Sequence, residues 1–121
     1  MKSLSLAGVG LLLSTLGAAA WEPTKSVEII VPFGPGGASD QMARTMQAII
    51  QKYNLSKQPF IVVNKPAATG GEAMIDMKKA RGDAHKLLTT SSTIYMTPLA
   101  TGIPGTWHDM TPVGMVAQDE F

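Results

Sequence analysis

The sequence predicts an α/β fold built on a parallel sheet with helices on its faces. Short apolar runs rich in β-branched residues alternate with segments that have helical periodicity. The first two runs each lead into a glycine-rich loop that precedes the next helical segment. Strands and helices that alternate at this spacing form parallel sheets with right-handed crossovers.

The first strand is predicted at residues 27–31, where Val-Glu-Ile-Ile-Val is nearly all apolar, as expected for a strand covered on both faces. Residues 32–37 contain two prolines and three glycines and must form a loop. A helix follows from Ser39, because apolar residues recur there at helical spacing and form one stripe. The stripe consists of Met42, Ala43, Met46, Ile49, Ile50 and Tyr53.

A second buried strand is predicted at residues 60–63 and a second helix after it. Thr69 and Glu72 have the spacing of a capping box at the start of this helix, and Gly82 is expected as its C′ residue. The apolar side of the helix is formed by Ala73, Met74, Met77 and Ala80.

A third strand is predicted at residues 86–90 and a last one at residues 113–117. Between them the chain is interrupted by Pro98, Pro104 and Pro112, so no helix is predicted there. The expected organisation is a leader of residues 1–20 followed by one incomplete α/β lobe over residues 21–121.

The first twenty residues have the pattern of a secretory signal peptide. Lys2 gives a positive start, residues 4–16 are apolar and uncharged, and Ala18-Ala19-Ala20 has the small residues of a cleavage site. The apolar run is shorter than the ~20 residues that a transmembrane helix needs. Cleavage is expected between Ala20 and Trp21, with an uncleaved anchor as the alternative. Export and the absence of cysteine fit a periplasmic protein.

The composition excludes several classes of function. The chain has no cysteine, which rules out a disulfide framework, thiolate metal sites and thiol redox chemistry. Its 10 basic and 9 acidic residues become equal in number once Lys2 is removed, so it lacks the basic excess of a nucleic-acid binder. The two histidines, His85 and His108, lack the spacing of metal ligands and are expected to be exposed polar residues. No metal or cofactor is expected.

Two glycine-rich loops, residues 32–40 and 64–71, are predicted to lie side by side at the carboxyl edge of the sheet, where ligands bind in such folds. Each contains a Gly-Gly pair near a helix start, and a helix N-terminus has unpaired N–H groups that suit an anion. The candidate ligand-binding residues are Gly36, Gly37, Ala38, Ser39, Asp40, Thr69, Gly70, Gly71 and Ser91.

The anion is not expected to be a nucleotide. Neither loop has the Gly-Lys-Ser/Thr ending of a P-loop, and the Rossmann pattern would need glycine at Ser39 and an acid where Asn64 stands. Pro35 also removes a backbone donor. A small organic carboxylate is the remaining ligand.

An enzyme acting on a small anionic substrate at the same loops is the alternative function. Such an enzyme needs a titratable group at this edge, and only Asp40 qualifies. Two roles stay open for Asp40: holding its loop with Arg44 at i+4, or accepting from a water, amine or hydroxyl of the ligand. Lys65, in the second loop, is the side-chain cation that could bind a carboxylate in place of the backbone N–H groups.

Several segments share the pattern of one known family: residues 21–25, 29–37 with Asp40 and Ala43-Arg44, 64–66 with Gly70-Gly71, Gly82-Asp83, and 109–113 with Val116-Ala117. In these segments the chain resembles the tricarboxylate-binding (TctC-like or Bug) extracytoplasmic solute receptors. The second loop is longer than the family usually has, and His85 replaces an expected tyrosine.

The resemblance implies a type II periplasmic-binding fold, with two lobes hinged around a carboxylated solute that is held largely by backbone amides and water. It also implies a monomer without enzymatic activity that delivers its solute to the membrane subunits of a tripartite tricarboxylate transporter. Members of this family are much longer, so the chain is expected to be the first lobe only, marginally folded by itself.

Overall fold

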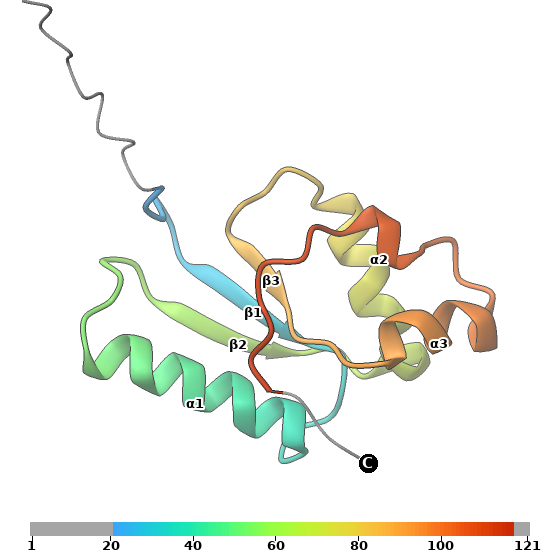
Figure 1. The fold of residues 1–121 in the computed structure, drawn as a ribbon, viewed down its shortest axis with the longest axis horizontal. Coiled ribbons are helices and arrows are strands. Elements are labelled where there is room, and N and C mark those ends of the chain that lie inside the picture. The colour runs from blue at the N-terminus through green and yellow to red at the C-terminus, as the bar shows by residue number, and fades with distance from the viewer. Residues whose placement is uncertain (1–20, 118–121) are drawn as a thin grey trace, which may run out of the picture.

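The computed structural model describes residues 21–117 and shows the predicted α/β class (Figure 1). The predicted signal peptide, including Ala20 of the cleavage site, lies outside the described residues. The elements in chain order are β1 (Val27–Val31), α1 (Ala38–Lys52), β2 (Phe60–Asn64), η1 (Ala67–Gly70), α2 (Gly71–Lys79), β3 (Lys86–Leu88), α3 (Thr93–Thr101) and η2 (Trp107–Asp109).

The three strands form a parallel sheet in the order β2-β1-β3, as the alternation of strands and helices predicts. Val31 pairs with Asn64 and Ile30 pairs with Leu88, so all three strands end at the same edge of the sheet. The loops that leave this edge are therefore neighbours in space. This placement brings the two glycine-rich loops together.

The core forms around β1, the central strand. Ile29 and Val31 pack with Ala43 of α1 on one face, and Ile30, which is also fully buried, points to the opposite face. The two faces are covered by different helices, with α1 on one side of the sheet and α2 and α3 on the other (Figure 1). Burying a side chain of this size contributes about 1.5–3 kcal/mol, which makes β1 the main anchor of the fold.

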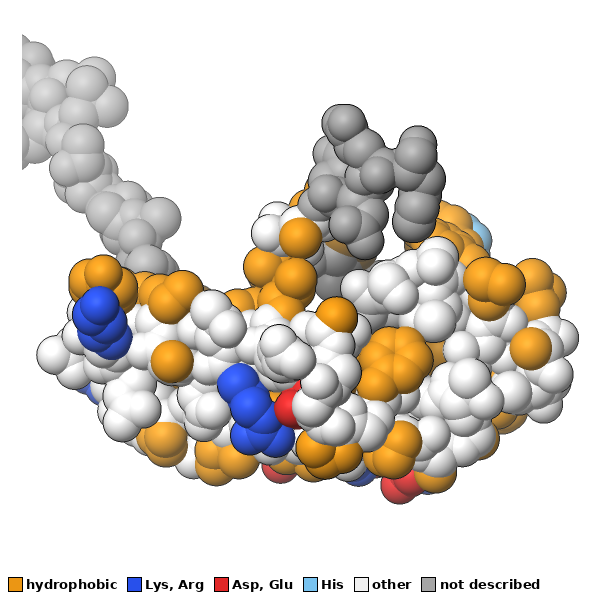
Figure 2. All heavy atoms as spheres, turned by 90° about the horizontal axis from the view of Figure 1, so that it is seen from below, with side chains coloured by type: hydrophobic (Ala, Val, Ile, Leu, Met, Phe, Trp, Pro, Cys, Tyr) orange, Lys and Arg blue, Asp and Glu red, His pale blue; other side chains and the backbone are white. Residues whose placement is uncertain are grey.

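The apolar stripe of α1 is only partly buried. Ala43 is buried, but Ile49 and Tyr53 are 45% and 62% exposed. From the side of α1, hydrophobic side chains are spread among polar ones and few are charged (Figure 2). The exposed part of the stripe thus lies toward the C-terminal end of the helix.

The prediction of a second fully buried strand is wrong. β2 is half-buried, and the Ile61 side chain is 45% exposed. The physical reason is its position, because β2 pairs only with β1 within residues 21–117 and so forms an edge of the sheet. β3 is also shorter than predicted, since Thr89 and Thr90 lie beyond it.

The chain after β3 differs most from the prediction. The last strand predicted at residues 113–117 is absent, since residues 111–117 pair with no strand and are exposed. Helix α3, which the sequence analysis did not predict, spans Thr93–Thr101 and contains Pro98. Proline at this position removes only one helical hydrogen bond, toward Ile94, so this short helix tolerates it.

The start and end of α2 also differ from the prediction. The helix begins at Gly71 with Gly70 as N-cap, and no side chain caps it. Thr69 is in the left-handed region with φ 53°, so it cannot form the predicted capping box. The C-cap is Ala80, and Gly82, with φ 86°, lies in the turn that follows. Ala73 and Met74 are buried as predicted.

No helix within residues 21–117 has both the length and the apolar character needed to span a membrane.

Candidate functional site

The two glycine-rich loops meet at the carboxyl edge of the sheet. Gly70 packs directly against Pro32, where a Cβ on Gly70 would lie 2.7 Å from the Pro32 Cβ and 2.9 Å from its carbonyl oxygen. The loop after β3 lies on the other side of β1 and includes Ser91, which is exposed. The structure thus brings the sequence-predicted residues to one edge.

Asp40 holds the first loop from inside. Its side chain is buried and accepts hydrogen bonds from the Gly36 N–H, from Arg44 Nε and from Asn64 Nδ2, each 2.9 Å long. These donors, with Arg44 contributing most, lower the pKa of Asp40 from 3.8 to about 2. Both carboxylate oxygens are occupied, so the loop-holding role of Asp40 is the one that the structure shows.

The first loop leaves a run of unpaired backbone donors at the start of α1. The Gly36 N–H is taken by Asp40, but the N–H groups of Gly37, Ala38 and Ser39 have no acceptor in the described part of the chain. Gly37 is the N-cap of α1, and no side chain caps this helix. Free N–H groups at a helix N-terminus attract anions.

The donors of the second loop are arranged differently. The Gly70 N–H donates to the Pro66 carbonyl at 3.4 Å, and the Gly71 N–H donates to the carbonyls of Ala67 and Ala68. These two glycines therefore use their N–H groups within the loop, although both were selected as ligand donors from the sequence. Gly70 is instead required by its φ of 83° and its contact with Pro32.

The second loop is strained and held by α3. Ala68 and Thr69 have φ values of 52° and 53°, which non-glycine residues rarely adopt. The buried Thr97 donates its Oγ1 hydroxyl to the Thr69 carbonyl at 3.1 Å. Thr97 could not be identified from the sequence, because Pro98 argues against a helix at this position. No local pattern indicates its contact with Thr69, which lies 28 positions earlier.

Lys65, the side-chain cation that could bind a carboxylate in place of the backbone donors, is paired with another residue. Its Nζ forms an ion pair with Asp76 of α2. The hydrogen bond between them raises the pKa of Lys65 and lowers that of Asp76. Ser91 also has a partner, since its Oγ lies 3.3 Å from the Thr93 hydroxyl.

A small cavity lies below these loops, between the end of β1, the second loop and α3. It is lined by Pro32, Thr69, Gly70, Leu88, Thr93 and Thr97, and its volume is about 10 Å³. This space suits one water molecule and no organic acid. A ligand at this edge would therefore rest on the loops.

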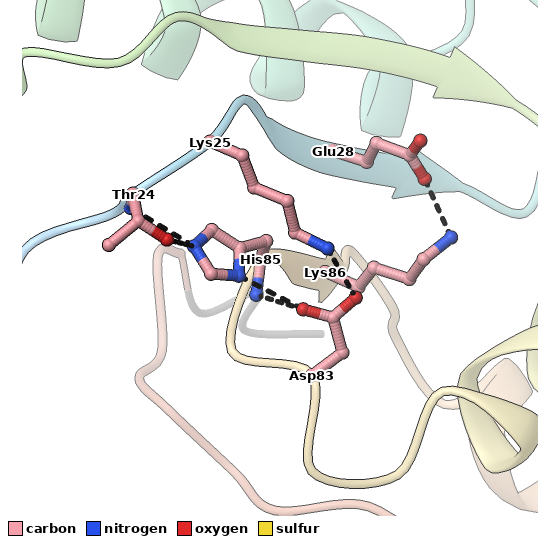
Figure 3. A network of polar contacts seen from close by, with 6 residues as sticks. All are labelled: Thr24, Lys25, Glu28, Asp83, His85 and Lys86. Carbon is pink, nitrogen blue, oxygen red and sulfur yellow. Dashed lines mark hydrogen bonds and ion pairs between the residues drawn. The ribbon is translucent and has the colours of Figure 1, made fainter.

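A second polar cluster lies at the opposite edge of the sheet (Figure 3). His85 Nε2 accepts the Thr24 N–H at 3.1 Å, and Nδ1 lies 3.0 Å from Asp83 Oδ1. The His85 side chain is only 14% exposed, which corrects the expectation of an exposed histidine. Lys25 pairs with Asp83, whose pKa is lowered to about 2 chiefly by the backbone N–H of His85. These contacts tie residues 24–25 to the start of β3.

No group of three or more acidic or histidine side chains that could hold a metal ion occurs within residues 21–117. His108, which was also expected to be exposed, is exposed and stacks on Trp107.

No family model matches the chain. It is similar to Protein BugT of Bordetella pertussis, with 33% identity over 92% of this chain and 36% of that protein. A UPF0065 protein of the same bacterium is 38% identical over 77% of this chain and 30% of its own length. The chain thus spans about a third of the length of these relatives.

Two solved structures resemble the fold. One is described as a periplasmic transporter and has a TM-score of 0.58 and 32% identity, over 69% of this chain and 28% of that one. The other is a TctC solute-binding protein from Polaromonas without ligand, with a TM-score of 0.60 and 29% identity, over 71% of this chain and 29% of that one. These likenesses confirm the family resemblance. Over the third of their length that it spans, the chain belongs to the TctC/Bug family of solute-binding proteins.

Proposed function

We propose that the protein is a periplasmic receptor that captures a small organic carboxylate as a monomer and delivers it to the membrane subunits of a tripartite tricarboxylate-type transporter. The observation that carries the proposal is the set of unpaired N–H groups of Gly37, Ala38 and Ser39 at the start of α1. The membership in a family of solute-binding proteins supports it.

Backbone donors at this position suit a carboxylate for two reasons. Each N–H that donates to a charged oxygen contributes about 1.5–3 kcal/mol, and two or three of them reach both oxygens of one carboxylate. The positive end of the α1 macrodipole adds to this attraction. Thr69 and Ser91, exposed on the neighbouring loops, offer hydroxyl groups to other polar atoms of the ligand.

Affinity and selectivity would depend on more than this lobe. About two thirds of the length of each relative lies outside the matched region. In the proposed receptor, a second lobe closes over the loops and supplies the contacts that distinguish one acid from another. The loops described here supply the contacts to the carboxylate group, which all such acids have in common.

The alternative of an enzyme at the same loops has less support. Asp40 was its only candidate acid or base, and both of its oxygens are occupied by donors of the chain. Because its pKa is lowered to about 2, this carboxylate is a weaker base than an ordinary aspartate.

Calorimetric titration tests the proposed ligand class. The intact protein is titrated with succinate, citrate and benzoate, and with the fully amidated, uncharged form of each acid as the matched control. We expect binding of at least one acid, with one molecule per chain, and no binding of its amide. Equal binding of acid and amide, or binding of none of the acids, would contradict the proposal.

Export is tested separately by N-terminal sequencing of the protein isolated from the periplasm. We expect the mature chain to begin at Trp21, after Ala18-Ala19-Ala20. A membrane-bound product that retains Met1 or Lys2 would contradict export with cleavage.

A further inference from the structure

Asn64 lies where the two glycine loops meet. It is the last residue of β2, it pairs with Val31 at the end of β1, and the second loop begins directly after it. Its side chain leaves β2 and reaches across to the first loop. The sequence predicted Asn64 as the first residue of the second glycine-rich loop and assigned its side chain no role.

The side-chain amide of Asn64 uses both of its ends. Nδ2 donates to the Phe33 carbonyl at 3.1 Å and to Asp40 Oδ1 at 2.9 Å, and Oδ1 accepts from Arg44 Nη2 at 3.3 Å. Two acceptors face the nitrogen and one donor faces the oxygen, so only one orientation of the amide satisfies all three partners. No other side chain of this size supplies two donors and an acceptor in this arrangement.

These contacts extend to both ends of the first loop. Phe33 lies at its beginning, and Asp40, which Asn64 holds, fixes the Gly36 N–H near its end. Arg44 Nε completes the cluster by donating to the second oxygen of Asp40. The unpaired N–H groups of Gly37, Ala38 and Ser39 follow directly after Gly36 in the chain.

We propose that Asn64 is a positioning residue that couples the two glycine loops, by fixing Phe33 and Asp40 so that the N–H groups at the start of α1 stay aimed at the ligand. This role rests on the proposed function, because it concerns how the carboxylate donors are presented. Asn64 itself does not contact the ligand. It sets the first loop relative to β2 and thereby relative to the second loop.

Amide hydrogen exchange of Gly36 tests the coupling without any ligand. The intact protein is compared with Asn64→Leu, which keeps the branched shape of the side chain but removes every polar contact. We expect Gly36 to exchange about tenfold faster in the variant, the effect of losing about one hydrogen bond. The Lys65 N–H, which donates to the Val31 carbonyl at 2.8 Å, reports on the sheet and is expected to stay protected.

The matched control is Gln47→Leu. Like Asn64, Gln47 donates its side-chain amide to a backbone carbonyl. Its acceptor is the Phe60 carbonyl at 2.7 Å, which lies at the opposite end of β2 from Asn64. We expect this variant to leave Gly36 exchange unchanged. If both variants accelerate Gly36 equally, the effect is general loosening and the proposal is wrong.

The Asn64→Asp variant tests whether Asn64 positions the first loop through its hydrogen bonds or only fills space between the loops. The new carboxylate faces Asp40 and repels it near neutral pH, although Arg44 faces both groups and reduces the repulsion. As the pH falls from about 7 to about 4, the pair takes up a proton, and the introduced carboxyl group then donates to Asp40.

We therefore expect Gly36 exchange, corrected for the intrinsic exchange rate at each pH, to be fast at about pH 7 and to slow toward the wild-type rate at about pH 4. A role in packing alone gives no such recovery. If Gly36 exchanges at the wild-type rate at every pH in Asn64→Asp and also in Asn64→Leu, Asn64 does not position the loop.

The titration with succinate and citrate separates this inference from the proposed function. If wild type binds an acid, Asn64→Leu is expected to bind it about tenfold more weakly, with the loss following the Gly36 exchange rate. If Gly36 exchange responds as expected but no acid binds to wild type, the coupling stands and the carboxylate function fails.

Discussion

Gly70 lies against Pro32 so closely that a methyl group at Gly70 would be 2.7 Å from the Pro32 Cβ. This contact joins the second glycine loop to the end of β1, and it gives Gly70 a role that does not depend on any ligand. Gly82 has nearly the same backbone conformation, with φ +86°, but nothing lies within 4 Å of its Cβ position.

Comparison of Gly70→Ala with Gly82→Ala separates these two effects. Both substitutions place alanine in the left-handed region, which costs about 1–2 kcal/mol of unfolding free energy. Gly70→Ala also forces the loop away from Pro32, and overpacking of this kind costs a further ~1–3 kcal/mol. Urea unfolding of the two variants measures the difference. Equal destabilisation would mean that the loop is free to move away from β1.

Thr97→Val is expected to loosen the second loop. Valine keeps the shape of the buried threonine but removes the hydrogen bond to the Thr69 carbonyl, for a loss of about 0.5–1.5 kcal/mol. Thr101→Val is the control, because its hydroxyl also bonds to a carbonyl, that of Thr97, but at an exposed position within α3. Urea unfolding is expected to show the larger loss for Thr97→Val, and the reverse order would contradict the anchoring role.

Stability is expected to fall in acid because of Asp40. Its pKa is about 2 in the folded protein and near 3.8 when unperturbed, so the unfolded chain takes up a proton first as the pH falls. The contribution of Asp40 is therefore complete above about pH 4 and is lost as the pH falls through about 2. Asp83, whose pKa is also lowered to about 2, adds to the same range.

Urea midpoints measured between about pH 5 and about pH 2 check this dependence. The Asp40→Asn variant is expected to be less stable at pH 5 and to lose less stability on acidification than wild type. Identical slopes for wild type and variant would show that the buried carboxylate is not the titrating group.

The sequence predicted those parts of the fold that depend on local pattern. The apolar run at 27–31, the periodicity after Ser39 and the Pro/Gly loops each specify their own conformation, and they placed β1, α1 and the first loop correctly. Pairing of Asp40 with Arg44 at i+4 was also predictable, because both residues lie on one helix.

The rest depends on contacts between distant residues. Nothing near Thr97 reveals that its hydroxyl holds Thr69, and nothing near Asn64 reveals that its amide spans Phe33 and Asp40. The two glycine pairs looked alike in sequence, yet the N–H of Gly37 has no acceptor in the described part of the chain, whereas the N–H groups of Gly70 and Gly71 turn back into their own loop. Equivalent sequence patterns were thus given different roles by the tertiary structure.

The comparison of Gly37→Val with Lys65→Ala tests the backbone-donor account most directly. Gly37 has φ −75° and ψ 171°, which valine adopts without strain, and a Cβ there would meet only the Gly34 carbonyl oxygen at 3.9 Å. The variant therefore keeps the fold while its side chain obstructs the approach to the N–H groups at the start of α1. Lys65, in contrast, is already paired with Asp76.

Calorimetric titration of both variants with the acid that wild type binds gives the decisive measurement. We expect Gly37→Val to bind roughly ten- to a hundredfold more weakly, the equivalent of one lost charge-assisted hydrogen bond, with a urea midpoint lowered only slightly because valine is a poorer N-cap than glycine. Lys65→Ala is expected to bind within about threefold of wild type, since an ion-paired lysine offers a ligand only a screened charge. Loss of binding in Lys65→Ala together with normal binding in Gly37→Val would contradict the account.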